Sequence, residues 1–162
     1  MLQEIMKKKE LLKLLDEENI EYVLQKEPAE SDTMERDQRE AVCLFLRDEQ
    51  NEKYYLIAKD AVKRCSLNAL RHILGSGPLT EASEKDMKRI LKQSADSLDA
   101  AGILNDRKHF CEAVFDIRLK NAQLVIRPEK CRSIICLESD GLVSLIRKQG
   151  HSVHWADLDQ IL

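Results

Sequence analysis

Residues 41–60 constrain the fold of this chain more than any other stretch of its sequence. They read AVCLFLRDEQNEKYYLIAKD. Two apolar runs of strand length, residues 41–46 and 54–58, flank a charged turn, and this pattern predicts a β-hairpin. Because the apolarity is continuous rather than alternating, we expect both faces of the hairpin to be covered. Amphipathic helices elsewhere in the chain would supply the covering layers.

Length and composition indicate one ordinary globular domain over residues 1–162. Hydrophobic residues make up 43% and charged residues 34% of the chain, which is typical of a soluble protein. No apolar run approaches the roughly 20 residues of a membrane span, and the N-terminal residues are too charged for a secretory signal. We therefore expect a cytoplasmic protein with no membrane partner. The net charge of −3 gives no general affinity for DNA or other nucleic acid, so any contact with a nucleic acid needs a local basic patch.

Helical and strand periodicities alternate along the chain and predict an α/β (α+β) fold. The expected helices cover residues 1–18, 66–74, a segment that begins at 83, and 139–150. The expected strands outside the hairpin cover residues 20–25, 111–117, 124–126, 133–137 and 152–158. Ser66 and Ser83 are suited to cap helix N-termini, while Gly75 and Gly150 are suited to end helices. Residues 26–40 are polar and are expected to form a loop or a short exposed helix.

The five cysteines are predicted to be reduced, buried thiols, because they are odd in number and lack CxxC spacing. Only Cys131 and Cys136 lie close together in the sequence. Strand alternation would put them on opposite faces, so a shared metal ion is not expected. We expect no metal and no cofactor.

Several segments in one order resemble the YbaK/prolyl-tRNA editing family, whose members hydrolyse wrongly charged aminoacyl-tRNA. The strand ending in Leu-Phe-Leu-Arg-Asp and the following Lys-Tyr-Tyr-Leu-Ile resemble the core hairpin of that family. Gly-Ile-Leu-Asn-Asp at residues 102–106 is similar to its Gly-Leu-Ile-Asn-Asp segment, and the likeness extends over roughly residues 10 to 158. The resemblance implies a mixed, barrel-like sheet wrapped by helices. It also implies that the acceptor end of tRNA is a partner, with an aminoacyl-tRNA synthetase as a further one.

Three positions depart from the family pattern where its pocket is expected. The Lys-Asn pair of the family is Val42-Cys43 here, and valine can neither neutralise a phosphate nor donate a hydrogen bond. Residues 92–101 lack the family's Gly-x-x-x-Pro loop. The histidine of its Phe-His-Pro segment is replaced by Arg127, which keeps a positive charge but cannot act as a general base near neutral pH, and Cys131 stands at a downstream asparagine.

The resemblance also indicates which residues would bind the substrate. Gly102, Asn105 and Asp106 belong to the segment shared with the family. Arg127, Lys130 and Arg132 are able to take over a phosphate or carbonyl contact, or they form a solvated basic loop.

Other chemistries receive less support from the sequence. Cys43 would be a nucleophile only with His109 or His154 beside it, and a cysteine in an apolar strand usually has a raised pKa. The aspartates at positions 48, 99, 106 and 116 are interpreted as residues of surface turns. The His-x-x-His segment at residues 151–154 is expected to expose both imidazoles.

Two functional hypotheses from different classes follow. The first is a hydrolase that removes a small amino acid such as alanine from mischarged tRNA in trans. In the family this reaction is thought to depend on a positioned water and on the terminal ribose hydroxyl of the tRNA. The second is a catalytically degenerate member that binds tRNA, an amino acid or a protein partner. Replacement of the Lys-Asn pair by Val42-Cys43 favours the second hypothesis.

Overall fold

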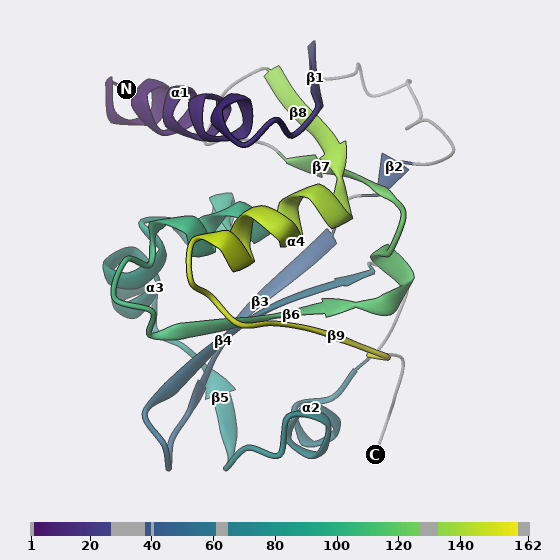
Figure 1. Ribbon diagram of the computed structural model, residues 1–162. Helices are drawn as coiled ribbons and strands as arrows, with labels where there is room; N and C mark the ends of the chain where they lie inside the picture. Colours follow the sequence, from purple (N-terminus) through teal and green to yellow (C-terminus); the bar gives the residue numbers. More distant parts are fainter. Residues whose placement is uncertain (1, 27–37, 40, 61–64, 127–132, 159–162) are drawn as a thin grey trace.

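Two β-sheets and the helices packed around them form the protein (Figure 1). The computed structural model describes residues 2–26, 38–39, 41–60, 65–126 and 133–158. The helices are α1 (Leu2–Glu17), α2 (Leu67–Leu74), α3 (Glu84–Leu91) and α4 (Ser139–Lys148), with the short 3₁₀ helices η1 (Ala95–Ser97), η2 (Ala100–Asn105) and η3 (Ile117–Leu119). No helix in these ranges has the length and apolar character needed to cross a membrane.

The predicted hairpin forms the middle of the larger sheet. This sheet has the order β5 (Leu79–Glu81), β3 (Ala41–Asp48), β4 (Lys53–Asp60), β6 (Cys111–Asp116) and β9 (Val153–Ala156). β3 and β4 are antiparallel from Ala41 opposite Asp60 to Asp48 opposite Lys53. The pairings of β4 with β6 and of β6 with β9 are parallel.

Both faces of the hairpin are covered, as its continuous apolarity predicted. Side chains alternate along β4: Leu56 joins the main core together with helix α4, whereas Ile57 joins a second cluster with Leu70 of α2. In Figure 1, α4 lies on one side of this sheet and α2 near its opposite side. Leu56 and Ile57 are 1% and 0% exposed, so neither face of β4 meets solvent.

A second, smaller sheet contains β1 (Tyr22–Lys26), β8 (Ser133–Glu138), β7 (Gln123–Ile126) and β2 (Gln38–Arg39), in that order. The mixed α/β class is therefore confirmed, but the expectation of a barrel-like sheet is wrong in that the described strands do not close. Among the described strands, β2 has two residues and pairs with β7, while the edge of β3 that faces away from β4 pairs with three residues of β5. These short pairings leave the two sheets separate.

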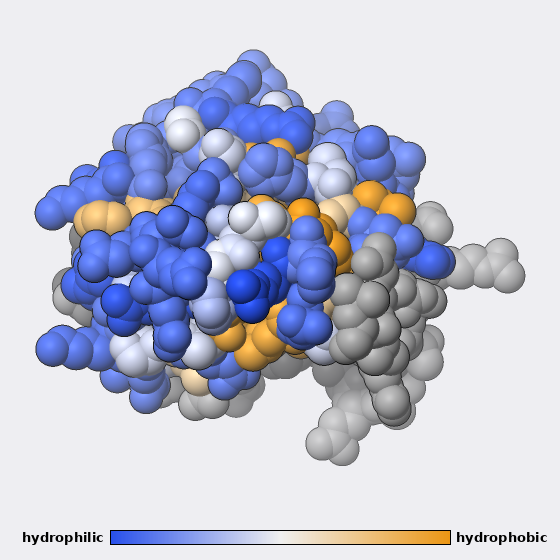
Figure 2. Space-filling model, turned by 90° about the horizontal axis from the view of Figure 1, so that it is seen from below, coloured by the Kyte–Doolittle hydropathy of each residue, from blue (hydrophilic) through white to orange (hydrophobic). Residues whose placement is uncertain are grey.

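One further strand expectation needs correction. We expected residues 20–25 to bury one face, and Ile20 and Tyr22 on one face are partly buried against the main core, but Val23 and Leu24 are 52% and 47% exposed. Among the described strands β1 is at the edge of the smaller sheet and pairs with β8, and its adjacent residues Val23 and Leu24 point to opposite faces, so the burial of its first residues does not extend along either face. On the face seen in Figure 2, hydrophilic residues predominate and hydrophobic residues form small separate patches.

The predicted helix caps are confirmed. The Ser66 hydroxyl accepts from the Ala69 backbone N at 3.0 Å, and the Ser83 hydroxyl accepts from the Asp86 backbone N at 3.1 Å. Gly75 ends α2 in the left-handed region with φ 62°, a conformation that glycine adopts without steric cost. These local signals set where α2 and α3 begin and where α2 ends.

Candidate functional site

Residues 93–106 form an irregular segment that polar contacts hold in place. The Gln93 side chain, 9% exposed, donates from Nε2 to Asp99 Oδ1 at 3.1 Å and accepts from the Asp99 backbone N at 3.2 Å. Asp99 Oδ1 also accepts from the Gly102 backbone N at 3.1 Å and so caps η2. Residues 93–106 are therefore held by side-chain contacts, whereas the hairpin is held by a regular backbone ladder.

Gly102 is required in this segment because another side chain occupies the space beside it. A Cβ atom built on Gly102 would collide with the amide group of Gln93. The absence of a side chain at Gly102, which was predicted to bind substrate, therefore leaves room for the Gln93 amide to contact Asp99. Its part in substrate binding stays a prediction.

A cavity of about 580 Å³ lies between this segment, helix α1 and the turn that follows α4. Its size falls within the range of small-molecule sites, roughly 300 to 1,000 Å³. Polar residues outnumber apolar ones in the lining, which includes Glu10, Lys13, Glu17, Gln93, Asp99, Asn105, Asp106, Arg107, His109, Gln149 and His151, with Leu11, Leu14, Ala101, Leu104 and Ile126 as its apolar part. Helix α1 thus lines the same cavity as the predicted Asn105 and Asp106, although its sequence indicated no site.

The start of β3 lies close to the same segment. Val42 is 40% exposed and offers only an apolar surface. Burial raises the pKa of the Cys43 thiol above its ordinary value, and the negative charge of Asp99 raises it further. The thiol is therefore neutral near pH 7, as expected for a cysteine in an apolar strand, and it is a poor nucleophile.

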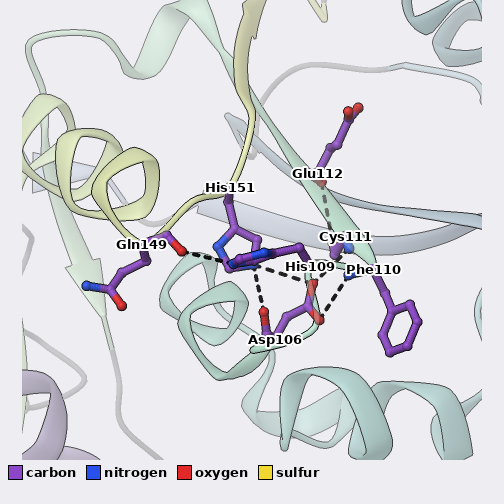
Figure 3. A network of polar contacts seen from close by, with 7 residues as sticks. All are labelled: Asp106, His109, Phe110, Cys111, Glu112, Gln149 and His151. Carbon is purple, nitrogen blue, oxygen red and sulfur yellow. Dashed lines mark hydrogen bonds and ion pairs between the residues drawn. The ribbon is translucent and has the colours of Figure 1, made fainter.

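Asp106 connects the irregular segment to strand β6. Its carboxylate accepts from the backbone N of Phe110 at 3.1 Å and from that of Cys111 at 2.8 Å (Figure 3). The residue is 2% exposed. Beside it, the Asn105 amide donates to the Leu91 carbonyl at 2.8 Å, which joins η2 to the end of α3.

The aspartates expected in surface turns lie at the ends of strands or next to turns and short helices, but three of them are buried. Asp48, Asp106 and Asp116 are 1%, 2% and 0% exposed, whereas Asp99 is partly buried. Each of the three accepts backbone N–H groups, which have no other partner where the chain turns. The interpretation was therefore right that these aspartates are found where the chain turns, and wrong that they are exposed.

His151 departs most clearly from expectation, because its imidazole is buried while that of His154 is exposed. Gly150, with φ 95°, turns the chain after α4 and directs His151 toward Asp106. His151 Nε2 lies 2.9 Å from the Asp106 carbonyl oxygen and 3.4 Å from Asp106 Oδ2. His154, in contrast, lies at the surface with Nε2 3.6 Å from Glu112 Oε2.

The polar contacts around His151 define its tautomer and leave one nitrogen unpaired. Two acceptors face Nε2, so Nε2 carries the hydrogen and Nδ1 is a free acceptor in the neutral ring. Within the described ranges Nδ1 has no hydrogen-bond partner. The His109 ring packs edge-on at 4.5 Å, and its Nε2 lies 2.9 Å from the Gln149 carbonyl oxygen (Figure 3). The sequence signal for this cluster was the glycine immediately before His151.

The remaining predicted residues fall in two groups. Arg127, Lys130, Cys131 and Arg132 lie outside the described residues. In the part of the chain that the structure describes, Cys43, Cys65, Cys111 and Cys136 form no disulfide, and no group of three metal-ligating side chains occurs. The contacts of His109 and His154 lead to Gln149, His151 and Glu112, so neither histidine is placed to activate Cys43.

Comparison with known proteins agrees with this fold. The sequence model of the aminoacyl-tRNA editing domain matches residues 33–145, more than half of the chain, and the chain belongs to that family. A relative is the prolyl-tRNA editing protein ProX of Acetoanaerobium sticklandii, 29% identical over 144 residues that cover 88% of this chain and 77% of that protein.

Two solved structures share the fold. One is a scaffold protein used for epitope backbone grafting by computational design, with a TM-score of 0.66, 16% identity and coverage of 92% of this chain and 94% of that one. The other is described as a candidate trans-editing enzyme for prolyl tRNA synthetase, with a TM-score of 0.64, 17% identity and coverage of 93% and 95%. The family match ends before His151 and begins after α1, so much of the cavity wall lies outside it.

Proposed function

We propose that the chain hydrolyses the ester bond of mischarged tRNA in trans, with alanyl-tRNA specific for proline as the first substrate to test. Membership of the editing family supports the reaction class. The observation that carries the proposal is the 580 Å³ cavity beside residues 93–106, which contain the Gly-Ile-Leu-Asn-Asp segment. This cavity is large enough for an aminoacyl group and part of a terminal nucleoside.

The residues around the cavity suit a reaction without a covalent enzyme intermediate. The Cys43 thiol is held neutral, and its position lies beside Asp99 rather than beside a histidine. Polar side chains from η2 and from the turn after α4 provide hydrogen-bonding groups that would position a water and the ribose hydroxyl. Catalysis would then depend on orientation and on fixed dipoles.

We further propose that this hydrolase acts in the cytoplasm and serves translation fidelity. The expected partner is the synthetase that releases the mischarged tRNA. Arg127, Lys130 and Arg132 stay candidates for contacts with the substrate.

The test is deacylation of a panel of mischarged tRNAs by the native chain and by a variant with a filled cavity. Leu104 lines the cavity, so Leu104→Trp is expected to reduce turnover by about tenfold or more, about 1.4 kcal/mol of transition-state stabilisation. Leu67→Trp, on α2 outside the lining, is the matched control and is expected to leave turnover unchanged. Equal turnover by all three proteins would show that hydrolysis occurs elsewhere.

One observation favours a second function, a binding module without catalysis. Val42 and the neutral Cys43 supply neither charge nor a strong donor at the position of the family's Lys-Asn pair. Absence of turnover on every tRNA by a folded native chain would support the binding module. The double variant Val42→Lys with Cys43→Asn separates the two cases further, because turnover gained by it would show that only the chemistry had been lost.

A further inference from the structure

A second hollow, of about 810 Å³, lies along the end of α3 and the loop that follows η2. We refer to it as the basic groove. Its lining contains five cationic side chains and one aromatic ring, namely Lys88, Arg89, Lys92, Arg107, Lys108 and Phe110. Such a concentration is notable in a chain whose net charge is −3.

Nearby carboxylates offset only part of this positive charge. Arg89 pairs with Asp86 at 3.0 Å, and Lys88 lies 4.0 Å from Glu84 in an exposed pair that contributes little. Within the described residues, Arg107 and Lys108 have no ion-pair partner.

The two carboxylates that line the basic groove are Glu10 and Asp106. Asp106 is 2% exposed and its oxygens are bound to backbone N–H groups of the 106–111 turn. Its charge is therefore directed into the protein, and Glu10 is the one carboxylate of the lining that stays available to a ligand.

Phe110 adds a flat apolar surface to this cationic environment. Its side chain is 40% exposed, and the Arg89 guanidinium lies 5.5 Å from the ring centroid. Asp106 holds the Phe110 backbone, and Figure 3 shows the ring pointing away from the Asp106–His151 cluster. An exposed aromatic ring beside cations is the arrangement on which nucleic-acid bases stack.

The basic groove adjoins the cavity of the candidate site. Both are lined by Glu10, Asn105, Asp106 and Arg107, so the two hollows meet at the end of η2. A polyanion lying in the groove would therefore have its end next to the cavity. The cavity itself has several carboxylates in its lining and would not attract a run of phosphates.

We propose that the basic groove binds the sugar-phosphate backbone of the tRNA acceptor arm, with a base stacked on Phe110, and leads the aminoacylated end into the cavity. This inference rests on the proposed editing function. Arg107 and Lys108 provide the phosphate contacts, and the Phe110 ring provides a contact that does not depend on salt. Because the net charge of the chain is negative, binding of tRNA requires a local basic patch, and the basic groove is such a patch.

Binding of uncharged tRNA, measured between about 0.05 and 0.2 M salt, tests the proposal. Arg107→Ala with Lys108→Ala is expected to weaken binding about tenfold and to reduce the slope of log K against log salt by about 2. The matched control, Arg71→Ala with Arg118→Ala, removes the same charge from exposed residues of α2 and η3, and is expected to bind as the native chain does. Phe110→Ala should weaken binding about fivefold or more with an unchanged slope, and Phe110→Tyr should restore it.

The outcomes separate this proposal from the proposed function. Equal weakening by the two double variants, or no binding of tRNA by the native chain at low salt, would overturn the basic groove, and deacylation by the same preparation would leave editing intact. Groove-dependent binding without deacylation supports the groove and argues against the hydrolase. Polyglutamate binding as tight as that of tRNA would overturn RNA as the occupant and indicate an acidic protein.

Discussion

Different kinds of interaction hold the hairpin of β3 and β4 and residues 93–110, which comprise the irregular segment 93–106 and the loop after it. In the hairpin, eight residue pairs form a continuous backbone ladder, and burial of apolar side chains on both faces stabilises it. In the segment, the side chains of Gln93, Asp99 and Asp106 accept hydrogen bonds from backbone N–H groups, because the short helices there form few backbone–backbone hydrogen bonds. The region with the less regular backbone is the one that lines both hollows.

This difference shows how the protein combines stability with a site. A regular sheet buries its polar backbone and leaves few groups for a ligand, whereas an irregular segment exposes donors and acceptors at its turns. Each side-chain contact in the segment is replaceable by mutation, unlike a backbone ladder. The comparison therefore predicts different sensitivities in the two regions.

The largest effect is expected in the hairpin. Ile57 is 0% exposed in β4, so Ile57→Ala should lower the free energy of unfolding by about 3 kcal/mol, within the usual range of about 2 to 5. Val23→Ala, on the exposed face of edge strand β1, should cost less than about 0.5 kcal/mol. Urea denaturation measures both. Similar losses in the two variants would show that the larger sheet is not the stabilising unit.

An intermediate effect is expected in the segment. Asp106→Ala leaves the backbone N–H groups of Phe110 and Cys111 without their acceptor and should cost about 2 kcal/mol. Asp106→Asn keeps one carbonyl oxygen and should lose less. Urea denaturation of the three proteins is the measurement. A native-like midpoint for Asp106→Ala would mean that other groups hold the turn.

The smallest effect concerns the turn of the hairpin and its dependence on pH. The Asp48 carboxylate accepts from Asn51 Nδ2 at 2.8 Å, and this hydrogen bond, followed by those from the backbone of Gly77, Gln50 and Asn51, lowers the Asp48 pKa. Because the folded pKa lies below the unfolded value of about 3.9, the contribution is present above about pH 4 and is lost as the pH falls through the folded pKa.

Comparison of the native chain with Asp48→Asn between about pH 6 and pH 2 tests this sign. At the upper end Asp48→Asn should be less stable by about 1 kcal/mol, and the difference should shrink as the pH falls. A gap that widens on acidification would show that Asp48 is not the group that titrates.

Local sequence signals predicted much of the fold. The hairpin, the serine caps of α2 and α3, and the glycines that end α2 and follow α4 depend on neighbours within a few residues. Among the site residues, Asn105 and Asp106 were located through the family segment, and the structure brings both to the cavity. The burial of His151 was not predicted, because it depends on contact with a residue 45 positions away.

By itself, the sequence determined the four α-helices, the covered hairpin, most of the longer strands and membership of the editing family. Only the tertiary structure decided that the strands form two sheets, that α1 closes a cavity against residues 93–106, and that the end of α3 meets residues 107–110 in a basic groove. The physical reason is the distance along the sequence between the residues that interact. Periodicity and caps are set by adjacent residues, whereas the pairing of distant strands and the meeting of distant charges are decided by packing of the whole chain.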